Sequence, residues 1–196
     1  IDPAGYGTNE AVFVIRDKFR AKIVARESIS TPRSMAIKTS TIMEHYKIPP
    51  GRVIVDSFGP RAALIQELSE AGVGRVRGIN VGEKPDDKDR FINRRAENYY
   101  RIKNWFRQGG QMVKAEGWNQ LLSIKYRREL SGKVKIKGKK EMKADEGIDD
   151  IGISDALMLT FDTEDRFGSQ PGGYGSGGAV ESLSNSQAAE LTKIYR

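Results

Sequence analysis

The sequence IDPAGYG at residues 1–7 decides the fold. A single apolar residue, Ile1, leads directly into Asp2, and a turn containing Gly5 and Gly7 follows. An apolar run then begins at residues 11–15. We interpret this arrangement as the end of a β-strand that delivers a carboxylate, followed by a hairpin that returns the chain beside it.

Two later segments end or begin with a carboxylate in a similar way. The β-branched run at residues 53–55 lacks alternation, which indicates a central strand buried on both faces, and Asp56 follows it. Asp155 lies at the start of an apolar helix predicted at residues 154–161. Because the carboxyl ends of central strands line the usual crevice of an open α/β sheet, we expect Asp2, Asp56 and Asp155 to face one another.

The remaining pattern predicts an α/β fold in which a mixed β-sheet carries helices on both faces. An antiparallel meander comes first, and right-handed β-α-β crossovers follow it. Residues 118–130 favour a helix, although the apolar residues 121–124 are also compatible with a strand. The other predicted elements are strands at 21–25, 76–81 and 133–137 and helices at 32–46, 61–71, 88–107 and 139–146.

Composition limits the classes of site that the chain can carry. The 196 residues suffice for one ordinary domain, and the absence of cysteine excludes disulfides and thiolate metal ligands. His45 is the only histidine, and its place near the end of a helical stripe indicates a structural role. A metal ion would therefore be bound by oxygen atoms, which favours Mg²⁺ or Mn²⁺.

The charge balance is compatible with a polyanionic partner such as nucleic acid. The formal net charge is +7, from 33 basic and 26 acidic residues. Lysines alternate along the strand predicted at 133–137 and continue into the next helix, so they form either a phosphate-binding row or a solvated face. Arginines on the predicted long helix share what we expect to be its exposed side. These residues are Lys133, Lys135, Lys137, Lys139 and Lys140 in the lysine row, and Arg90, Arg94 and Arg95 on the helix.

A change of composition indicates a domain boundary near residue 168. Gly, Ser, Asn and Gln dominate from there, which predicts a compact domain at residues 1–167 and a flexible tail at 168–196. A short amphipathic segment lies within the tail at residues 188–195. We find no secretion signal and no apolar run near the roughly 20 residues that a membrane helix requires.

Three carboxylates at one place need a cation. Their mutual repulsion raises one pKa unless a divalent ion neutralises them. Two such ions, about 4 Å apart, activate a water and stabilise the leaving oxygen in phosphodiester hydrolysis. The alternative for any one of the three is an ordinary role as a turn residue or helix cap.

Five segments in this order resemble the nuclease domain of the large terminase subunit of tailed bacteriophages, a member of the RNase H-like superfamily. The resemblance covers most of residues 1–163. The segments are IDPAGYG at 1–7, VIVDSFG at 53–59, GINVGEKP at 78–85, NRRAENYY at 93–100 and ISDALMLTF at 153–161.

The resemblance implies a cluster of acids that binds two Mg²⁺ or Mn²⁺ ions and cleaves concatemeric double-stranded viral DNA during genome packaging. Asp2, Asp56 and Asp155 match the first, second and third acids of the family. The family often has an acid or a histidine just before its third acid, where this chain has Ser154. Additional candidate ligands for the metal are the nearby acids Asp149 and Asp150, together with Glu10 and Glu83 near the rim.

The resemblance also implies partners and a location. These are an ATPase motor domain on the same parent chain, the portal and the small terminase subunit, in the cytoplasm of an infected bacterial host. The sequence contains no G-x-x-x-x-G-K-[ST] loop, so we expect no ATP hydrolysis from this chain itself.

Two other functions remain open from the sequence. The first is a non-catalytic domain of the same fold that docks nucleic acid or protein, with the acids serving as turn residues. The second is the core of an integrase or transposase. Those enzymes commonly use glutamate as the last acid, whereas this chain has Asp155.

Overall fold

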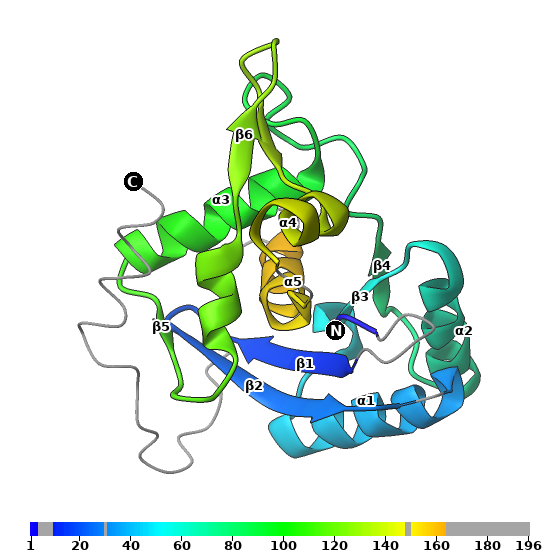
Figure 1. Ribbon diagram of the computed structural model, residues 1–196. Helices are drawn as coiled ribbons and strands as arrows, with labels where there is room; N and C mark the ends of the chain where they lie inside the picture. The colour runs from blue at the N-terminus through cyan, green and yellow to red at the C-terminus, as the bar shows by residue number, and fades with distance from the viewer. Residues whose placement is uncertain (4–9, 30, 148–149, 164–196) are drawn as a thin grey trace.

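The computed structural model describes residues 1–3, 10–29, 31–147 and 150–163 (Figure 1). Several sequence expectations lie outside the described residues. They concern the turn at Gly5 and Gly7, the candidate ligand Asp149, the tail at 168–196 and its amphipathic segment at 188–195.

An antiparallel hairpin forms the first part of the sheet. β1 (Ala11–Arg16) pairs with β2 (Arg20–Glu27). The carboxylate of Asp17 closes the turn between them, because its Oδ1 accepts hydrogen bonds from the backbone N–H groups of Phe19 and Arg20 at 2.8 and 2.6 Å. A two-residue strand absent from our sequence prediction, β5 (Gln111–Met112), adds to β2 in parallel.

The second part of the sheet consists of two short parallel strands. β3 (Ile54–Asp56) pairs with β4 (Arg77–Ile79), at the places where the sequence predicts strands. The residues of β3 are all buried, which agrees with a strand near the middle of a sheet.

Residues 1 and 2 join these two parts of the sheet. Asp2 and Val12 exchange both backbone hydrogen bonds, at 3.1 and 3.0 Å, in an antiparallel bridge to β1. On the other side, the Ile1 nitrogen donates to the Ile54 carbonyl at 2.7 Å, and the Asp56 N–H donates to the Ile1 carbonyl at 3.3 Å. We call this two-residue link the seam. It gives the order β4-β3-seam-β1-β2-β5, a mixed sheet in which residues 1 and 2 lie where the sequence predicts the first strand to end.

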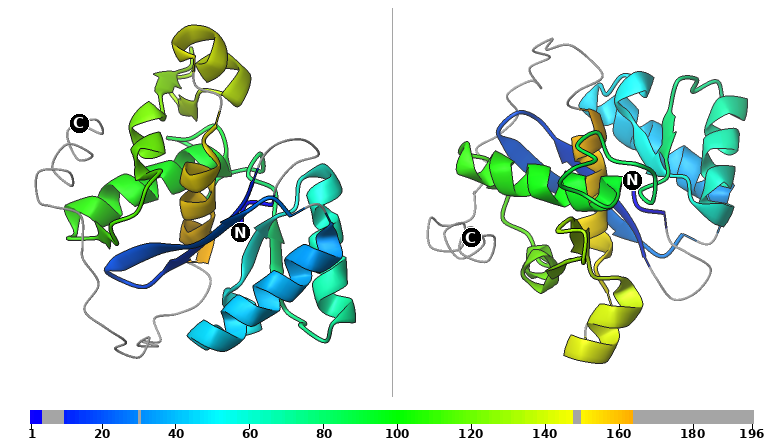
Figure 2. Two further views of the ribbon diagram at one scale, coloured as in Figure 1. Left: turned by 60° about the horizontal axis from the view of Figure 1, so that its bottom comes forward. Right: turned by 90° about the horizontal axis from the view of Figure 1, so that it is seen from above.

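Helices cover both faces of this sheet, as predicted. Successive residues of a strand point to opposite faces, and here they enter two separate cores. Phe13 and Val55 pack with α1 (Pro32–Tyr46) and α2 (Ala62–Glu70). Val12 and Ile54 pack with α3 (Arg94–Arg107) and α5 (Gly152–Leu159). Figure 2 shows the two groups of helices on either side of the β1–β2 hairpin.

The remaining elements are short. A hairpin of β6 (Tyr126–Arg128) and β7 (Val134–Ile136) projects from the body, and α4 (Lys139–Glu146) follows it (Figure 1). Short 3-10 helices occur at η1 (Pro50–Arg52), η2 (Gly59–Arg61), η3 (Trp118–Ser123) and η4 (Thr160–Thr163). Every helix within the described residues is too short or too polar to cross a lipid bilayer.

Two sequence predictions of helices are wrong. The helix predicted at 88–107 begins only at Arg94, because the Asn93 side chain caps it and the Ile92 N–H donates to the Val134 carbonyl at 3.0 Å. The segment 118–130 is neither one helix nor a strand at 121–124, but η3 followed by β6. In both cases the backbone forms hydrogen bonds with β7 in place of the helical hydrogen bonds that the local pattern predicts.

Candidate metal centre

The structure brings the three predicted acids together from three different elements. Asp2 lies in the seam, Asp56 ends β3, and Asp155 lies in the first turn of α5. All three are buried, with exposed fractions of 5%, 7% and 9%. The negative charges of Asp155 and, more weakly, Asp56 act on Asp2, so the seam residue is the electrostatic centre of the group.

Asp2 is the acid whose charge is least well compensated. Burial, followed by the negative charge of Asp155, raises its pKa to about 7, although Lys139 and Arg61 oppose the shift. Compared with a solvent-exposed aspartate, Asp2 therefore has a greater tendency to be protonated in the chain alone. A cation that contacts it directly would favour its ionised form.

Asp56 is held by its own loop. Its Oδ1 accepts the backbone N–H of Phe58 at 3.1 Å, and its Oδ2 accepts from Nη1 of Arg61. The same Nη1 lies 3.5 Å from Oδ1 of Asp2. One guanidinium nitrogen thus bridges two acids, and its charge reduces the repulsion between them.

Asp155 is held by α3. Its Oδ1 accepts the hydroxyl of Tyr99 at 2.8 Å and Nη2 of Arg95 at 3.1 Å, while its Oδ2 lies 3.4 Å from Nζ of Lys139. Burial by itself would raise the pKa of Asp155, but Arg95, then Lys139 and the Tyr99 hydroxyl, outweigh burial and keep it below its usual value. Asp155 is therefore a carboxylate at neutral pH.

The first residue of α5, Gly152, lies close to Asp2. A side chain at Gly152 would place its Cβ 3.7 Å from Oδ2 of Asp2 and 3.4 Å from Cγ2 of Val12. Asp150 does not join the three acids: its Oδ1 accepts the Gly152 N–H at 2.8 Å and its Oδ2 accepts from Gln120 at 3.0 Å. Asp150 thus binds the N–H of the first residue of the helix that carries Asp155.

The other candidate ligands lie elsewhere or outside the described residues. The carboxylate of Glu10 is paired with Arg26 at 2.8 Å on the surface. Glu83 is exposed in the loop after β4, and its backbone carbonyl accepts the Arg94 N–H at 2.9 Å. Asp149 falls in the undescribed gap at 148–149.

The donor chemistry of the three acids fits a hard divalent cation, because carboxylate oxygens are the preferred ligands of Mg²⁺ and Mn²⁺. In the positions observed, however, each acid lies against a cationic side chain. Among the described residues, no three acidic or histidine side chains form a ready-made metal cage. The cations Arg61 and Lys139 stand where a metal ion would have to contact Asp2, Asp56 and Asp155.

Sequence reasoning missed the ion pairs of two arginines on α3. We expected Arg94 and Arg95 on an exposed helix face, and that expectation is wrong. Arg94 is buried in an ion pair with Asp162 at 2.9 Å, and the partly buried Arg95 binds Asp155. Asp162 and Asp155 lie 68 and 60 residues away from these arginines, which a local pattern cannot reveal. The spacing of Arg95 and Tyr99, one turn apart on α3, was the available signal.

The lysine row continues into the acidic centre. Lys135 and Lys137 carry ion pairs with Glu129 and Asp145 at 3.5 and 2.8 Å, on and beside the β6–β7 hairpin. Lys139 is the point at which the row meets Asp155. The row therefore leads along the surface toward the three acids.

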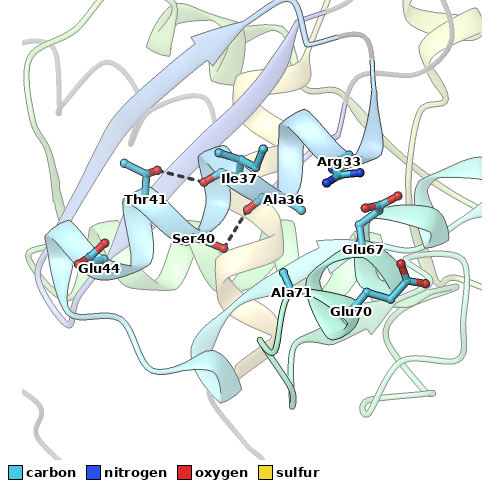
Figure 3. Close-up of a pocket in the computed structure, with 9 residues that line it drawn as sticks. All are labelled: Arg33, Ala36, Ile37, Ser40, Thr41, Glu44, Glu67, Glu70 and Ala71. Atoms are coloured by element: carbon cyan, nitrogen blue, oxygen red, sulfur yellow. Dashed lines mark hydrogen bonds between the residues drawn. The ribbon is translucent and has the colours of Figure 1, made fainter.

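The molecule also has a groove of about 520 Å³ between α1 and α2. Figure 3 shows its lining, where the hydroxyls of Ser40 and Thr41 bond to backbone carbonyls of their own helix. It contains none of the predicted site residues, and it lies on the helix layer that covers the opposite face of the sheet from α5. The groove is therefore separate from the three acids.

The mixed sheet, with helices on both faces, places the chain in the RNase H-like class of α/β folds, the class of the terminase nuclease domains. The solved structures that share this fold include the nuclease domain of the large terminase subunit gp2 of bacterial virus Sf6, with a TM-score of 0.69 and 19% identity. A mutant of that domain with calcium gives 0.69 and 20%, and one with manganese and β-thujaplicinol gives 0.68 and 21%. Each alignment covers 82% of this chain and 85% of the other. No protein-family model and no curated protein matches the sequence.

Proposed function

We propose that the chain is a divalent-metal-dependent DNA endonuclease that cleaves concatemeric double-stranded viral DNA during genome packaging. The observation that carries this proposal is the convergence of Asp2, Asp56 and Asp155, buried, from three separate elements. The fold shared with terminase nuclease domains supports it.

The three acids would hold the metal, which we propose to be two Mg²⁺ or Mn²⁺ ions. Such ions, when bound, supply an activated water and stabilise the leaving oxygen. The protein residues position the acids: Tyr99 and Arg95 fix one oxygen of Asp155, and the Phe58 N–H fixes one oxygen of Asp56. No side chain acts as a covalent nucleophile.

The lysine row would bind the DNA backbone. Lys133, Lys135 and Lys137 lie on and beside β7, and Lys139 and Lys140 lie at the start of α4, where Lys139 meets Asp155. A surface of this kind tracks phosphates without reading sequence. It would bring a phosphodiester to Asp155 along the row.

The same proposal includes the domain organisation, the partner proteins and the cellular location. Residues 1–167 would form the nuclease domain and residues 168–196 a separate tail. In the parent protein an ATPase motor would act with the nuclease, together with the portal and the small terminase subunit. The site of action would be the cytoplasm of an infected bacterial host.

The direct test is Mn²⁺-dependent nicking of plasmid DNA. Asp2→Asn, Asp56→Asn and Asp155→Asn should each abolish nicking, because each removes a charged ligand without changing shape. Asp89→Asn is the matched control, since Asp89 is an exposed carboxylate in the loop before α3. Undiminished nicking by Asp2→Asn or Asp56→Asn would refute the assignment.

The ion pairs of the three acids favour one alternative, a non-catalytic docking domain in which they serve only structure. The two functions differ in their response to metal. Mn²⁺ should raise the melting temperature of the nuclease at millimolar concentration, because ligands that bind only the folded state stabilise it. A docking domain without a metal site should give no such rise.

A further inference from the structure

Arg61 occupies the position from which a cation contacts both Asp2 and Asp56. Its Nη1 donates to Oδ2 of Asp56 and lies 3.5 Å from Oδ1 of Asp2. The second oxygen of Asp56 is taken by the Phe58 N–H. A metal ion that binds these two acids through the oxygens on which Arg61 lies would therefore compete with its guanidinium.

We propose that Arg61 is a displaceable counter-ion, which holds Asp2 and Asp56 together in the absence of metal and competes with the divalent ion for them. The inference rests on the proposed function, because it takes these acids to be metal ligands. It assigns Arg61 a positioning role, acting through Asp2 and Asp56.

The local structure around Arg61 would allow its guanidinium to move away from Asp2 and Asp56. It ends η2, five residues after Asp56, in a turn that begins at Gly59 with a φ of 63°. About 25% of its side chain is exposed, so a path to solvent exists. The guanidinium can therefore swing outward while its backbone stays in place.

Arg95 provides the contrast within the same site. Its guanidinium bonds Asp155 and also donates to the Lys137 carbonyl at 3.1 Å, and it lies over the ring of Tyr99 at 5.4 Å. It contacts Oδ1 of Asp155 and leaves Oδ2 to Lys139. Arg95 is thus a fixed part of the site, whereas Arg61 is the removable cation.

The effect of Arg61 on the affinity for metal can be estimated from the repulsion between the two cations. A doubly charged ion and a guanidinium about 5 Å apart repel enough, even at the dielectric constant of water, to change affinity roughly tenfold. Removing the charge of Arg61 should therefore tighten Mn²⁺ binding by about that factor. The same change should lower the melting temperature without metal, because the two acids no longer share a cationic partner.

The experiment measures Mn²⁺ binding by calorimetry on the whole chain at pH 8, for the wild type, Arg61→Gln and Arg61→Lys. Arg61→Gln should bind roughly tenfold more tightly, and Arg61→Lys should return toward the wild-type value. Arg127→Gln is the matched control, because Arg127 also pairs with carboxylates, Glu129 and Glu141, but lies on β6. Its Mn²⁺ affinity should not change.

Each outcome has a definite meaning. Binding by the wild type with equal or weaker binding by Arg61→Gln overturns the counter-ion proposal and leaves the nuclease intact. Tighter binding by Arg61→Gln supports the proposal even where the wild type binds too weakly to measure. No binding by either protein, together with no nicking, overturns the metal site itself.

A second measurement needs no variant. In the wild type, the side-chain Nε–H signal of Arg61 in NMR should move toward the position of a solvent-exposed arginine as Mg²⁺ is added. The Arg95 signal should remain that of a bound guanidinium. An Arg61 signal that stays unchanged while Mg²⁺ binds would overturn the proposal.

Discussion

At the scale of single residues, the site is a balance of three carboxylates and three cations. Asp2 lies at the centre of this balance, with its pKa raised by burial and by Asp155, whereas Arg95 keeps the pKa of Asp155 low. Two neighbouring acids therefore have opposite protonation at mildly acidic pH. The difference arises from their partners, since both are buried.

Asp2 should make the stability of the metal-free chain depend on pH. Its pKa rises from 3.8 to about 7 on folding, so the folded state binds a proton that the unfolded state releases. The stability that Asp2 contributes is full below about pH 4 and is lost as pH rises through 7. Thermal unfolding in EDTA at pH 5 and pH 8 should show this loss in the wild type.

The Asp2→Asn variant is the reference for that measurement. The Ile1 amine, whose pKa is lowered by burial to about 6 despite Asp2 and Asp56, acts in the opposite direction between about pH 6 and 8. The amine is present in both proteins, but Asp2 itself raises the pKa of the amine, so the difference between the proteins reports Asp2 together with its interaction with the amine. Equal pH dependence in the two proteins would contradict the raised pKa.

Tyr99 should matter more than its neighbour Tyr100. Tyr99→Phe removes the hydroxyl that donates to Asp155 at 2.8 Å, and hydrogen bonds to charged groups contribute about 1.5–3 kcal/mol. We expect lower stability in urea and weaker nicking. Tyr100→Phe, at a half-buried ring that packs edge-on against Phe91, is the control and should change neither. Equal effects in both variants would argue against a specific role for the Tyr99 hydroxyl.

Residue patterns predict the acids of the site but not the arginines that bind them. The acids follow apolar strands or begin an apolar helix, which are local signals that survive in one sequence. The cations act across the fold: Arg95 and Asp155 are 60 residues apart. Arg61 lies only five residues after Asp56, yet nothing in a Gly-Pro-Arg turn indicates that its side chain folds back.

At the scale of elements, strand positions follow from the sequence and helix boundaries do so less well. β3, β4 and β7 fall within or beside the runs that predict them. The errors at 88–93 and 118–130 share a cause, since both segments lie against β7 and exchange local helical bonds for bonds to that strand or its hairpin. A pairing between distant segments leaves no periodic signal in either.

The close approach of β4 to α2 should make Gly78 intolerant of substitution. A Cβ at Gly78 would collide with Cδ1 of Ile65 and lie 2.8 Å from Cβ of Ser57. Gly78→Ala should therefore cost about 1–3 kcal/mol, as overpacking typically does. The measurement is urea unfolding, with Gly74→Ala as the control, because no atom lies within 4 Å of a Cβ there. Equal stability of both variants would show that α2 can shift away.

At the scale of the whole molecule, the lysine row and the groove between α1 and α2 differ in the charge of their side chains. The row and the acids lie on the side of α3, α4 and α5, whereas the groove is lined by three glutamates, Glu44, Glu67 and Glu70, and one arginine, Arg33 (Figure 3). Of these two surfaces, the lysine row is therefore the one that suits a polyanion. The net charge of +7 alone, read from the sequence, does not show this difference.

DNA binding should depend on salt in proportion to the number of lysines that bind phosphates. Removing one phosphate-binding lysine should reduce the slope of log affinity against log salt by about 0.9. Lys133→Gln and Lys140→Gln should each show this reduction in fluorescence anisotropy with duplex DNA. Lys38→Gln is the control, since Lys38 lies on α1 and pairs with Glu27. An unchanged slope in both test variants would move the DNA-binding surface elsewhere.

The backbone hydrogen bonds of the seam should respond to metal binding at Asp2. The backbone joint between the two halves of the sheet is made by the same two residues that present the first acid. Any event that tightens or loosens Asp2 is therefore transmitted to the amides of Val12 and Asp56, which donate to the seam carbonyls. Hydrogen exchange at those two amides reads the occupancy of the site from the backbone, with no label and no substrate. Residues 1 and 2 thus both present the first acid of the site and connect the two parts of the sheet.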